Sequence, residues 1–230
     1  MKINQIKRGV GLLLAPIAFA LVTTSCEDVE IDNLNDPELT ATLSNADDYP
    51  ATLNGAYYSW WNALHKYDPY MTLSVAADHG TSSWGNFNMR EVGTVSEPYG
   101  LGDHSALNNT QSAPSVAYLE TPWYQLYSSI TTANNVLRGI NIDGNLVNDD
   151  AVITEQTVGQ AQFIRGLSYG YLALLFDQGF LVTEDTDISG LNGDSLVDYN
   201  SISAQAIQDL REMISIAQGN SSFSIPQFNG

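Results

Sequence analysis

TEQTVGQAQFIRGLSYGYLALLFDQGFLVTED, residues 154–185, is the stretch that decides the fold of this chain. Between Ala161 and Phe176 the only charged residue is Arg165, and apolar or aromatic side chains leave hardly any polar side to a helix. Gln, Arg, Ser and Gly interrupt the run too often for it to span a bilayer. The stretch therefore predicts a central helix that other helices cover on several faces.

Two residues of this stretch carry specific expectations. Arg165 would lie among apolar neighbours, where a charge needs partners. We expect a carboxylate or backbone carbonyls beside it, in a structural rather than a catalytic role. Gly179 follows the last apolar turn, and we expect it to close the helix in the left-handed conformation.

The composition is strongly acidic. The 230 residues hold 26 Asp and Glu against 8 Lys and Arg, a formal charge of −18. Three of the bases, Lys2, Lys7 and Arg8, precede every acid of the chain. Such a surface repels nucleic acid and anionic lipid, so we expect no nucleic-acid partner and a neutral or cationic ligand. With 43% hydrophobic residues the chain can form one substantial core, or one domain and a tail.

The N-terminus has the layout of a secretory leader. Residues 1–25 combine a basic start, an apolar run and small residues before Cys26, the only cysteine. A lone cysteine directly after a leader is typical of the lipidated residue of a bacterial lipoprotein, and it can form no intrachain disulfide. The alternative is a cysteine that merely lies near an ordinary cleavage site. Residues 26–45 predict an acidic tether, followed by a helical region over 46–230.

Further helices are expected on either side of the central one. The first begins near Ala46 with Pro50 in its first turn, and a short second run follows over Pro69–Ala77. The next begins with Thr121 as its cap and Pro122 in its first turn. After a loop over Asn141–Asp150 the central helix follows as its antiparallel neighbour. The last helix begins near Ser201 and ends at Gly219, with one amphipathic face made by Ile202, Ala206, Leu210, Met213 and Ala217.

Aromatic and polar residues on these helices are interpreted as structural. Tyr57 and either Trp60 or Trp61 fall on a helical stripe. Tyr57 and Trp60 are interpreted as packing in the core, and Trp61 as the residue at the rim. Asn134 falls on a buried stripe, where it should hydrogen-bond to a neighbouring backbone.

The long segment Thr81–Pro114 is rich in Gly, Ser, Asn and Pro and predicts an ordered functional loop. A flat ring covers the apolar face of a pyranose, and amides bond to its hydroxyls. This chemistry favours a carbohydrate, and the alternative is that the rings only plug the loop onto the core. The candidate ligand-binding residues are Trp84, Asn86, Asn88, Arg90 and Tyr99.

Catalytic and metal chemistry are not expected. The pairs Asp78–His79 and Asp103–His104 lack a nucleophile motif, and three scattered histidines give no metal-ligand spacing. The Asp185, Asp187 and Ser189 pattern matches the start of a calcium loop, but Leu196 stands where a bidentate Glu is needed. An acidic Asx-turn loop is the favoured interpretation there. We therefore expect no catalytic residue, no metal and no cofactor.

Three pieces of the chain, in the same order, resemble the SusD/RagB family of outer-membrane nutrient-binding lipoproteins from Bacteroidetes. The pieces are GAYYSWWNAL at Gly55–Leu64, ITTANNVLRGI at Ile130–Ile140, and AQFIRGLSYGYLALLFDQGFLVTED at Ala161–Asp185. The resemblance implies an all-α, SusD-like fold with tetratricopeptide-like helix pairs and long binding loops. The later half of the family has no counterpart here, which implies the N-terminal portion of such a protein.

The same resemblance implies a function. Acids after Cys26 resemble the surface-export signal of these lipoproteins, which places the protein on the outer membrane through a lipid anchor. In the family, an aromatic ring and an Asn of the loop after the second helix contact the glycan, which corresponds to Trp84 with Asn86 or Asn88. The expected function is capture of an oligosaccharide and its delivery to a SusC-like TonB-dependent transporter. The alternatives are a peptide-binding, RagB-like lipoprotein and, as a third possibility, a surface hydrolase.

Overall fold

A computed structural model describes residues 43, 45–65, 73–75, 77, 79–80 and 116–225. Of residues 116–119 it describes the backbone alone. The chain divides into two units, Met1–Glu38 and Leu39–Gly230, and all described residues belong to the second. The predicted leader, Cys26 and nearly all of the predicted tether lie outside the described residues. So do the loop residues Trp84, Asn86, Asn88, Arg90 and Tyr99.

Helices dominate the described part of the chain. They hold 75% of its residues, which confirms the predicted helical character. The main helices are α3 (Tyr49–His65), α6 (Val116–Asn141), α7 (Ala151–Leu175) and α8 (Tyr199–Gly219). The shorter elements are the 3-10 turns η1 (Ala46–Asp48), η4 (Val147–Asp149), η5 (Ile188–Gly190) and η6 (Gly193–Ser195), and the strands β1 (Gln178–Phe180) and β2 (Leu196–Asp198).

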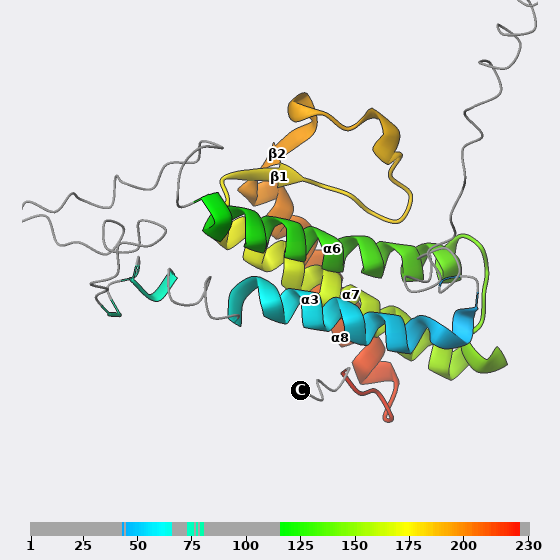
Figure 1. Cartoon of the computed structure of the whole chain (residues 1–230). Helices are drawn as coiled ribbons and strands as arrows, with labels where there is room; N and C mark the ends of the chain where they lie inside the picture. Colours follow the sequence, from blue (N-terminus) through cyan, green and yellow to red (C-terminus); the bar gives the residue numbers. More distant parts are fainter. Residues whose placement is uncertain are drawn as a thin grey trace, which may run out of the picture. The chain divides into compact units, whose positions relative to one another are not determined.

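Along the chain, each main helix packs antiparallel against the next, and Figure 1 shows α3, α6 and α7 side by side. The direction follows from crossed pairings, in which the start of one helix meets the end of its neighbour. These pairings are Tyr49 with Gly139 and Ala56 with Ser129 for α3 and α6, Trp123 with Phe176 and Asn134 with Arg165 for α6 and α7, and Gly159 with Ile216 and Arg165 with Asp209 for α7 and α8.

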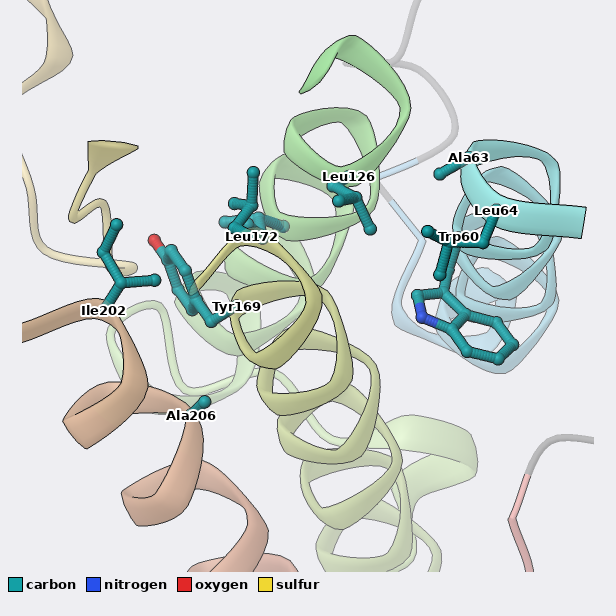
Figure 2. Packing of buried hydrophobic residues seen from close by; sticks show 9 residues of the cluster. Trp60, Ala63, Leu64, Leu126, Tyr169, Leu172, Ile202 and Ala206 are labelled. Carbon is teal, nitrogen blue, oxygen red and sulfur yellow. The ribbon is translucent and has the colours of Figure 1, made fainter. Parts of the chain in front are cut away.

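The central position of α7 is visible in the core. Figure 2 shows Tyr169 and Leu172 of α7 between Leu126 of α6 on one side and Ile202 of α8 on the other. All four side chains are fully buried. A second buried cluster joins α3, α6 and α7 through Tyr49, Leu53, Ala133, Val136, Leu137, Val147 and Ala161. The prediction of a central helix covered on several faces is therefore confirmed.

Helix α3 also agrees with its pattern. It follows η1 directly, and Pro50 lies in its first turn, where the missing N–H costs nothing. Trp60 is 8% exposed and packs in the core, whereas Trp61 is 38% exposed. The predicted division between a core tryptophan and a rim tryptophan is confirmed.

The start of α6 was predicted wrongly. The helix begins at Val116, and Pro122 lies inside it rather than in its first turn. A proline within a helix removes one backbone hydrogen bond and crowds the preceding turn. Pro122 is buried, and Leu126 and Ile130 farther along the helix are fully buried. Because packing of such a face stabilises a helix more than local propensity does, the helix continues through the proline.

The end of α7 also differs from its prediction. The helix ends at Leu175, its cap residue Phe176 is extended, and Gly179 lies in strand β1. In the described residues the only glycine with positive φ is Gly144. A Cβ on Gly179 would stand 2.7 Å from the Tyr127 hydroxyl oxygen and 2.9 Å from Ile202 Cδ1. This glycine therefore permits close packing and does not close the helix.

Strands β1 and β2 form a small antiparallel sheet, with Gln178 opposite Asp198 and Phe180 opposite Leu196. The sheet connects the end of α7 to the start of α8, where the Asp198 carboxylate accepts the Ser201 N–H at 2.9 Å. The pairing of residues 178–180 with a second strand depends on contacts about twenty residues away along the chain.

Candidate functional site

Arg165 is the centre of a buried polar network. Its side chain is 5% exposed, and it donates from Nε to Asp209 Oδ2 at 2.9 Å and from Nη2 to Asp209 Oδ1 at 2.7 Å. The Nη1 group donates to Asn134 Oδ1 at 2.9 Å and also to a carboxylate oxygen of Glu184. Of the two kinds of partner predicted for Arg165, a carboxylate or backbone carbonyls, the structure shows carboxylates.

The charges of this network stabilise one another. Burial alone would lower the pKa of Arg165, but the hydrogen bonds and charges of Asp209 and Glu184 raise it above its ordinary value. Burial raises the pKa of Asp209, and the hydrogen bonds and charge of Arg165 oppose that shift. Burial also tends to raise the pKa of Glu184, yet its hydrogen bonds and Arg165 hold it below its usual value. Arg165 therefore remains protonated and keeps a charged partner at neutral pH.

Two tyrosines hold the end of β1 and the segment that follows it. The Tyr169 hydroxyl donates to the Val182 carbonyl at 2.6 Å and accepts the Val182 N–H at 2.8 Å. The Tyr127 hydroxyl makes the same pair of bonds with the backbone of Phe180. Burial raises the pKa of Tyr127 to about 12 and that of Tyr169 further, so both hydroxyls keep their protons.

Asn134 adds a third contact to this segment. Its side-chain N–H donates to the Val182 carbonyl at 2.8 Å, while its oxygen accepts from Arg165. The predicted bond from Asn134 to a neighbouring backbone is thus confirmed. Side chains of α6 and α7 thus fix the end of β1 at Phe180 and, beyond the strand, Val182 and Glu184.

Beside this fixed segment lies a groove with a volume of about 330 Å³. It is built where the first half of α6, the end of α7 and the two strands meet. The residues that line it are Glu120, Trp123, Tyr124, Phe176, Asp177, Gln178 and Leu196. We call this the aromatic groove.

The floor of the aromatic groove is held by ring packing. Trp123 meets Phe176 edge to face, with ring centroids 5.0 Å apart and an interplanar angle of 84°. Its ring also packs on that of Tyr127, with centroids 4.8 Å apart, and Tyr127 is the tyrosine that binds the backbone of Phe180. Tyr124 is different, because it is 65% exposed and presents a ring to solvent. Helix α6 thus contributes one anchored ring and one accessible ring to the groove.

The polar lining of the groove is acidic. Glu120, Asp177 and Gln178 are exposed. Their side chains offer carboxylate and amide oxygens as hydrogen-bond acceptors, and Gln178 offers donors as well. Accessible rings next to such groups can bind a ligand that has apolar faces and hydroxyl or ammonium groups.

The site predicted from the sequence lies in the loop 81–114, outside the described residues. That prediction includes none of the groove residues Glu120, Trp123, Tyr124 and Asp177. The available pattern was the dense cluster ETPWYQ at 120–125, together with FDQ directly after the last apolar turn of α7. Neither cluster indicates by itself that the two meet.

The acidic loop after the tyrosine-bound segment agrees with the Asx-turn interpretation. Asp187 caps η5 by accepting the Ser189 N–H at 2.9 Å, and Asp185 accepts a hydrogen bond from the Thr183 hydroxyl. Among the residues whose placement is described, no group of three or more His, Cys, Asp or Glu side chains is arranged to hold a metal ion.

Within the described ranges, no helix combines the length and hydrophobicity of a membrane span. Comparisons with known proteins give no relative to set beside this chain: no protein-family model matches it, and neither a curated protein nor a solved structure shows significant similarity.

Proposed function

We propose that this protein is a cell-surface lipoprotein of the SusD/RagB type that binds an oligosaccharide and delivers it to a TonB-dependent outer-membrane transporter. Two kinds of observation support the family assignment. Three sequence pieces resemble the family in the right order, behind a lipoprotein-like leader. The successive antiparallel helices α3, α6, α7 and α8 are compatible with tetratricopeptide-like helix pairs.

The observation that carries the binding function is the aromatic groove. Trp123 and Tyr124 give the groove ring surface of the kind that stacks on a pyranose, and Tyr124 is largely exposed. Glu120, Asp177 and Gln178 provide acceptors for the sugar hydroxyls at the same place. Because Trp123 packs edge to face on Phe176, its position is set before a ligand arrives, which lowers the entropy cost of binding.

An oligosaccharide array tests this proposal with the leaderless chain and its Tyr124→Ala variant. We expect one glycan class to bind the parent chain and the variant to lose affinity by about 1–3 kcal/mol, roughly fivefold or more. Tyr58→Ala is the matched control, because Tyr58 is also an exposed helical tyrosine, at 56%, but does not line the groove. If no glycan binds to the folded parent chain, the proposed function is wrong.

The loop prediction is tested in the same experiment. A Trp84→Ala variant should also lose glycan affinity if its ring is part of the binding surface. A folded Trp84→Ala variant with full affinity would assign the binding to the aromatic groove alone. Unfolding of the variant would support the alternative that Trp84 plugs the loop onto the core.

A second candidate function follows from one specific observation. Glu120 and Asp177 come from different elements and line the same groove, and glycosidases act through such a pair of carboxylates. Incubation of the leaderless chain with a labelled oligosaccharide distinguishes the two functions. A binding protein returns the ligand unchanged, whereas a hydrolase gives shorter products that disappear with Glu120→Gln.

A further inference from the structure

The aromatic groove has a one-sided charge. Glu120 and Asp177 are both carboxylates, and none of the residues lining the groove is Lys, Arg or His. The described arginines are elsewhere: Arg165 is paired in the core, Arg138 lines a different cavity and Arg211 is exposed on α8. A ligand in the groove therefore meets negative charge that no described cation neutralises.

The small sheet of β1 and β2 adds a third carboxylate beside the groove. Asp198 lies opposite Gln178 in the antiparallel register. Its carboxylate accepts the Ser201 N–H as the cap of α8, and that bond holds its pKa below the ordinary value. Asp198 therefore stays ionised near neutral pH and strengthens the negative potential on this side.

The rings of the groove favour the same ligand charge. Aromatic faces attract ammonium groups, and Trp and Tyr do so more strongly than Phe. In the described part of the chain, no carboxylate of the groove accepts a hydrogen bond from another side chain, and Tyr124 is 65% exposed. A cation bound here would meet two carboxylates and ring faces together, whereas an anionic sugar would be repelled.

We infer that the aromatic groove selects an oligosaccharide that carries a protonated amino group, such as an unacetylated glucosamine unit. This inference rests on the proposed function and names the ligand class of the same site. The ammonium group lies between Glu120 and Asp177, and the apolar face of the pyranose stacks on Tyr124. N-acetylation removes the positive charge, so the acetylated sugar keeps the stacking and loses the ionic contacts.

The test is calorimetric titration of the leaderless chain with two hexasaccharides of equal length, one of glucosamine and one of N-acetylglucosamine. At low salt and pH 6 we expect the glucosamine hexasaccharide to bind about tenfold more tightly, because two ionic contacts of the exposed kind add to cation–π attraction. Added salt should reduce this ratio, since screening acts on the charged ligand alone.

A double variant, Glu120→Gln with Asp177→Asn, should lose most of the preference for the glucosamine hexasaccharide, because only the rings and Asp198 still attract its ammonium groups. The matched control is Asp143→Asn with Glu155→Gln, which removes the same net charge from exposed positions outside the groove. The control variant should keep the tenfold preference.

The failure of this inference differs from the failure of the proposed function. If both hexasaccharides bind the parent chain equally, or if the groove variant keeps the preference, charge selection is wrong while glycan binding stands. If the folded chain binds neither hexasaccharide but binds neutral glycans on the array, the inference is again wrong and the proposed function stands. If it binds no glycan at all, both are wrong.

Discussion

Arg165 of α7 and Asp209 of α8 form an ion pair with two hydrogen bonds inside the core, at 2.9 and 2.7 Å. Asp209 is fully buried, and Gln205 one turn earlier donates to the same carboxylate at 2.9 Å. The same guanidinium binds Asn134 and Glu184, so one side chain ties α6, α7, α8 and the extended segment together. Two of the elements that it joins, α6 and the end of α7, also contribute residues to the aromatic groove.

Removal of one partner of this pair should be severe. In Asp209→Ala the Arg165 guanidinium stays buried and loses its main counter-charge, so we expect a loss of about 3–5 kcal/mol in the free energy of unfolding. Urea denaturation followed by circular dichroism measures it. The exposed Asp143→Ala serves as the control and should change stability by less than about 0.5 kcal/mol. Equal stability of the two variants would show that the ion pair does not hold α8.

The tyrosine hydroxyls should matter through the backbone groups that they satisfy. Tyr169→Phe leaves the N–H and C=O of Val182 without the hydroxyl, and we expect a loss of about 1–3 kcal/mol. Tyr124→Phe is the control, because this tyrosine is exposed and should tolerate the change. Hydrogen exchange of the Val182 amide gives a local readout, which should speed up in the Tyr169 variant alone. Unchanged exchange would contradict the role assigned to Tyr169.

Two glycine-to-alanine changes should have opposite signs. Gly179→Ala would bring Cβ within 2.7 Å of the Tyr127 oxygen and 2.9 Å of Ile202, so we expect a loss of about 1–3 kcal/mol from overpacking. Gly55 lies in α3, and a Cβ added there would have no heavy atom within 4 Å. There the gain in helix propensity should stabilise the protein by about 0.5–1 kcal/mol. Thermal melts measure the change in stability of both variants. A stabilised Gly179→Ala would contradict the close approach of Tyr127 and Ile202 to residue 179.

Glu184 should make stability sensitive to acid. Its pKa is lowered in the folded protein, so its contribution is fully present above the pKa of about 4.3 in the unfolded chain and is lost as the pH falls through the folded value. Stability should therefore decline below about pH 4 more steeply in the parent chain than in Glu184→Gln. Urea midpoints from pH 3 to pH 7 test this. If the midpoints of the two proteins fell in parallel with pH, Arg165 would not stabilise the ionised form of Glu184.

Cys26 decides membrane attachment if the protein is a lipoprotein. Cys26→Ser removes the only thiol that a lipid could modify, so we expect the full-length variant expressed in a Gram-negative host to leave the membrane fraction. Detergent-phase partitioning and metabolic labelling with a fatty acid measure the change against the parent protein. Continued partitioning of the variant into detergent would contradict lipidation.

Several features were predictable because they depend on short-range pattern. The apolar run around Arg165 predicted a central helix, since no orientation of that helix leaves a polar face to water. The same run predicted that the guanidinium must find a carboxylate or backbone carbonyls, because an unpaired buried charge is too costly. The helical spacing of the first helix likewise predicted that one of the two neighbouring tryptophans, Trp60 or Trp61, packs in the core.

Other features depended on packing between distant segments. Sequence could not identify Asp209 as the partner of Arg165, because the two are 44 positions apart and many acids compete. It misjudged Pro122 and Gly179 because tertiary contacts override local preference at both. The loop residues Trp84, Asn86, Asn88, Arg90 and Tyr99 stay a prediction. The aromatic groove was not foreseen, since Tyr124 and Asp177 are neighbours only after α6 and α7 pack.

The sequence by itself determined that this chain forms helices around a nearly all-apolar central one, and that its charged centre requires a partner. Both conclusions follow from the free energy of exposing apolar surface or burying a charge, which each segment carries wherever it lies. The tertiary structure alone decided which acid meets Arg165, where the proline and glycine are tolerated, and which rings and carboxylates share a groove. These are properties of distances between segments, and only the packed helices set those distances.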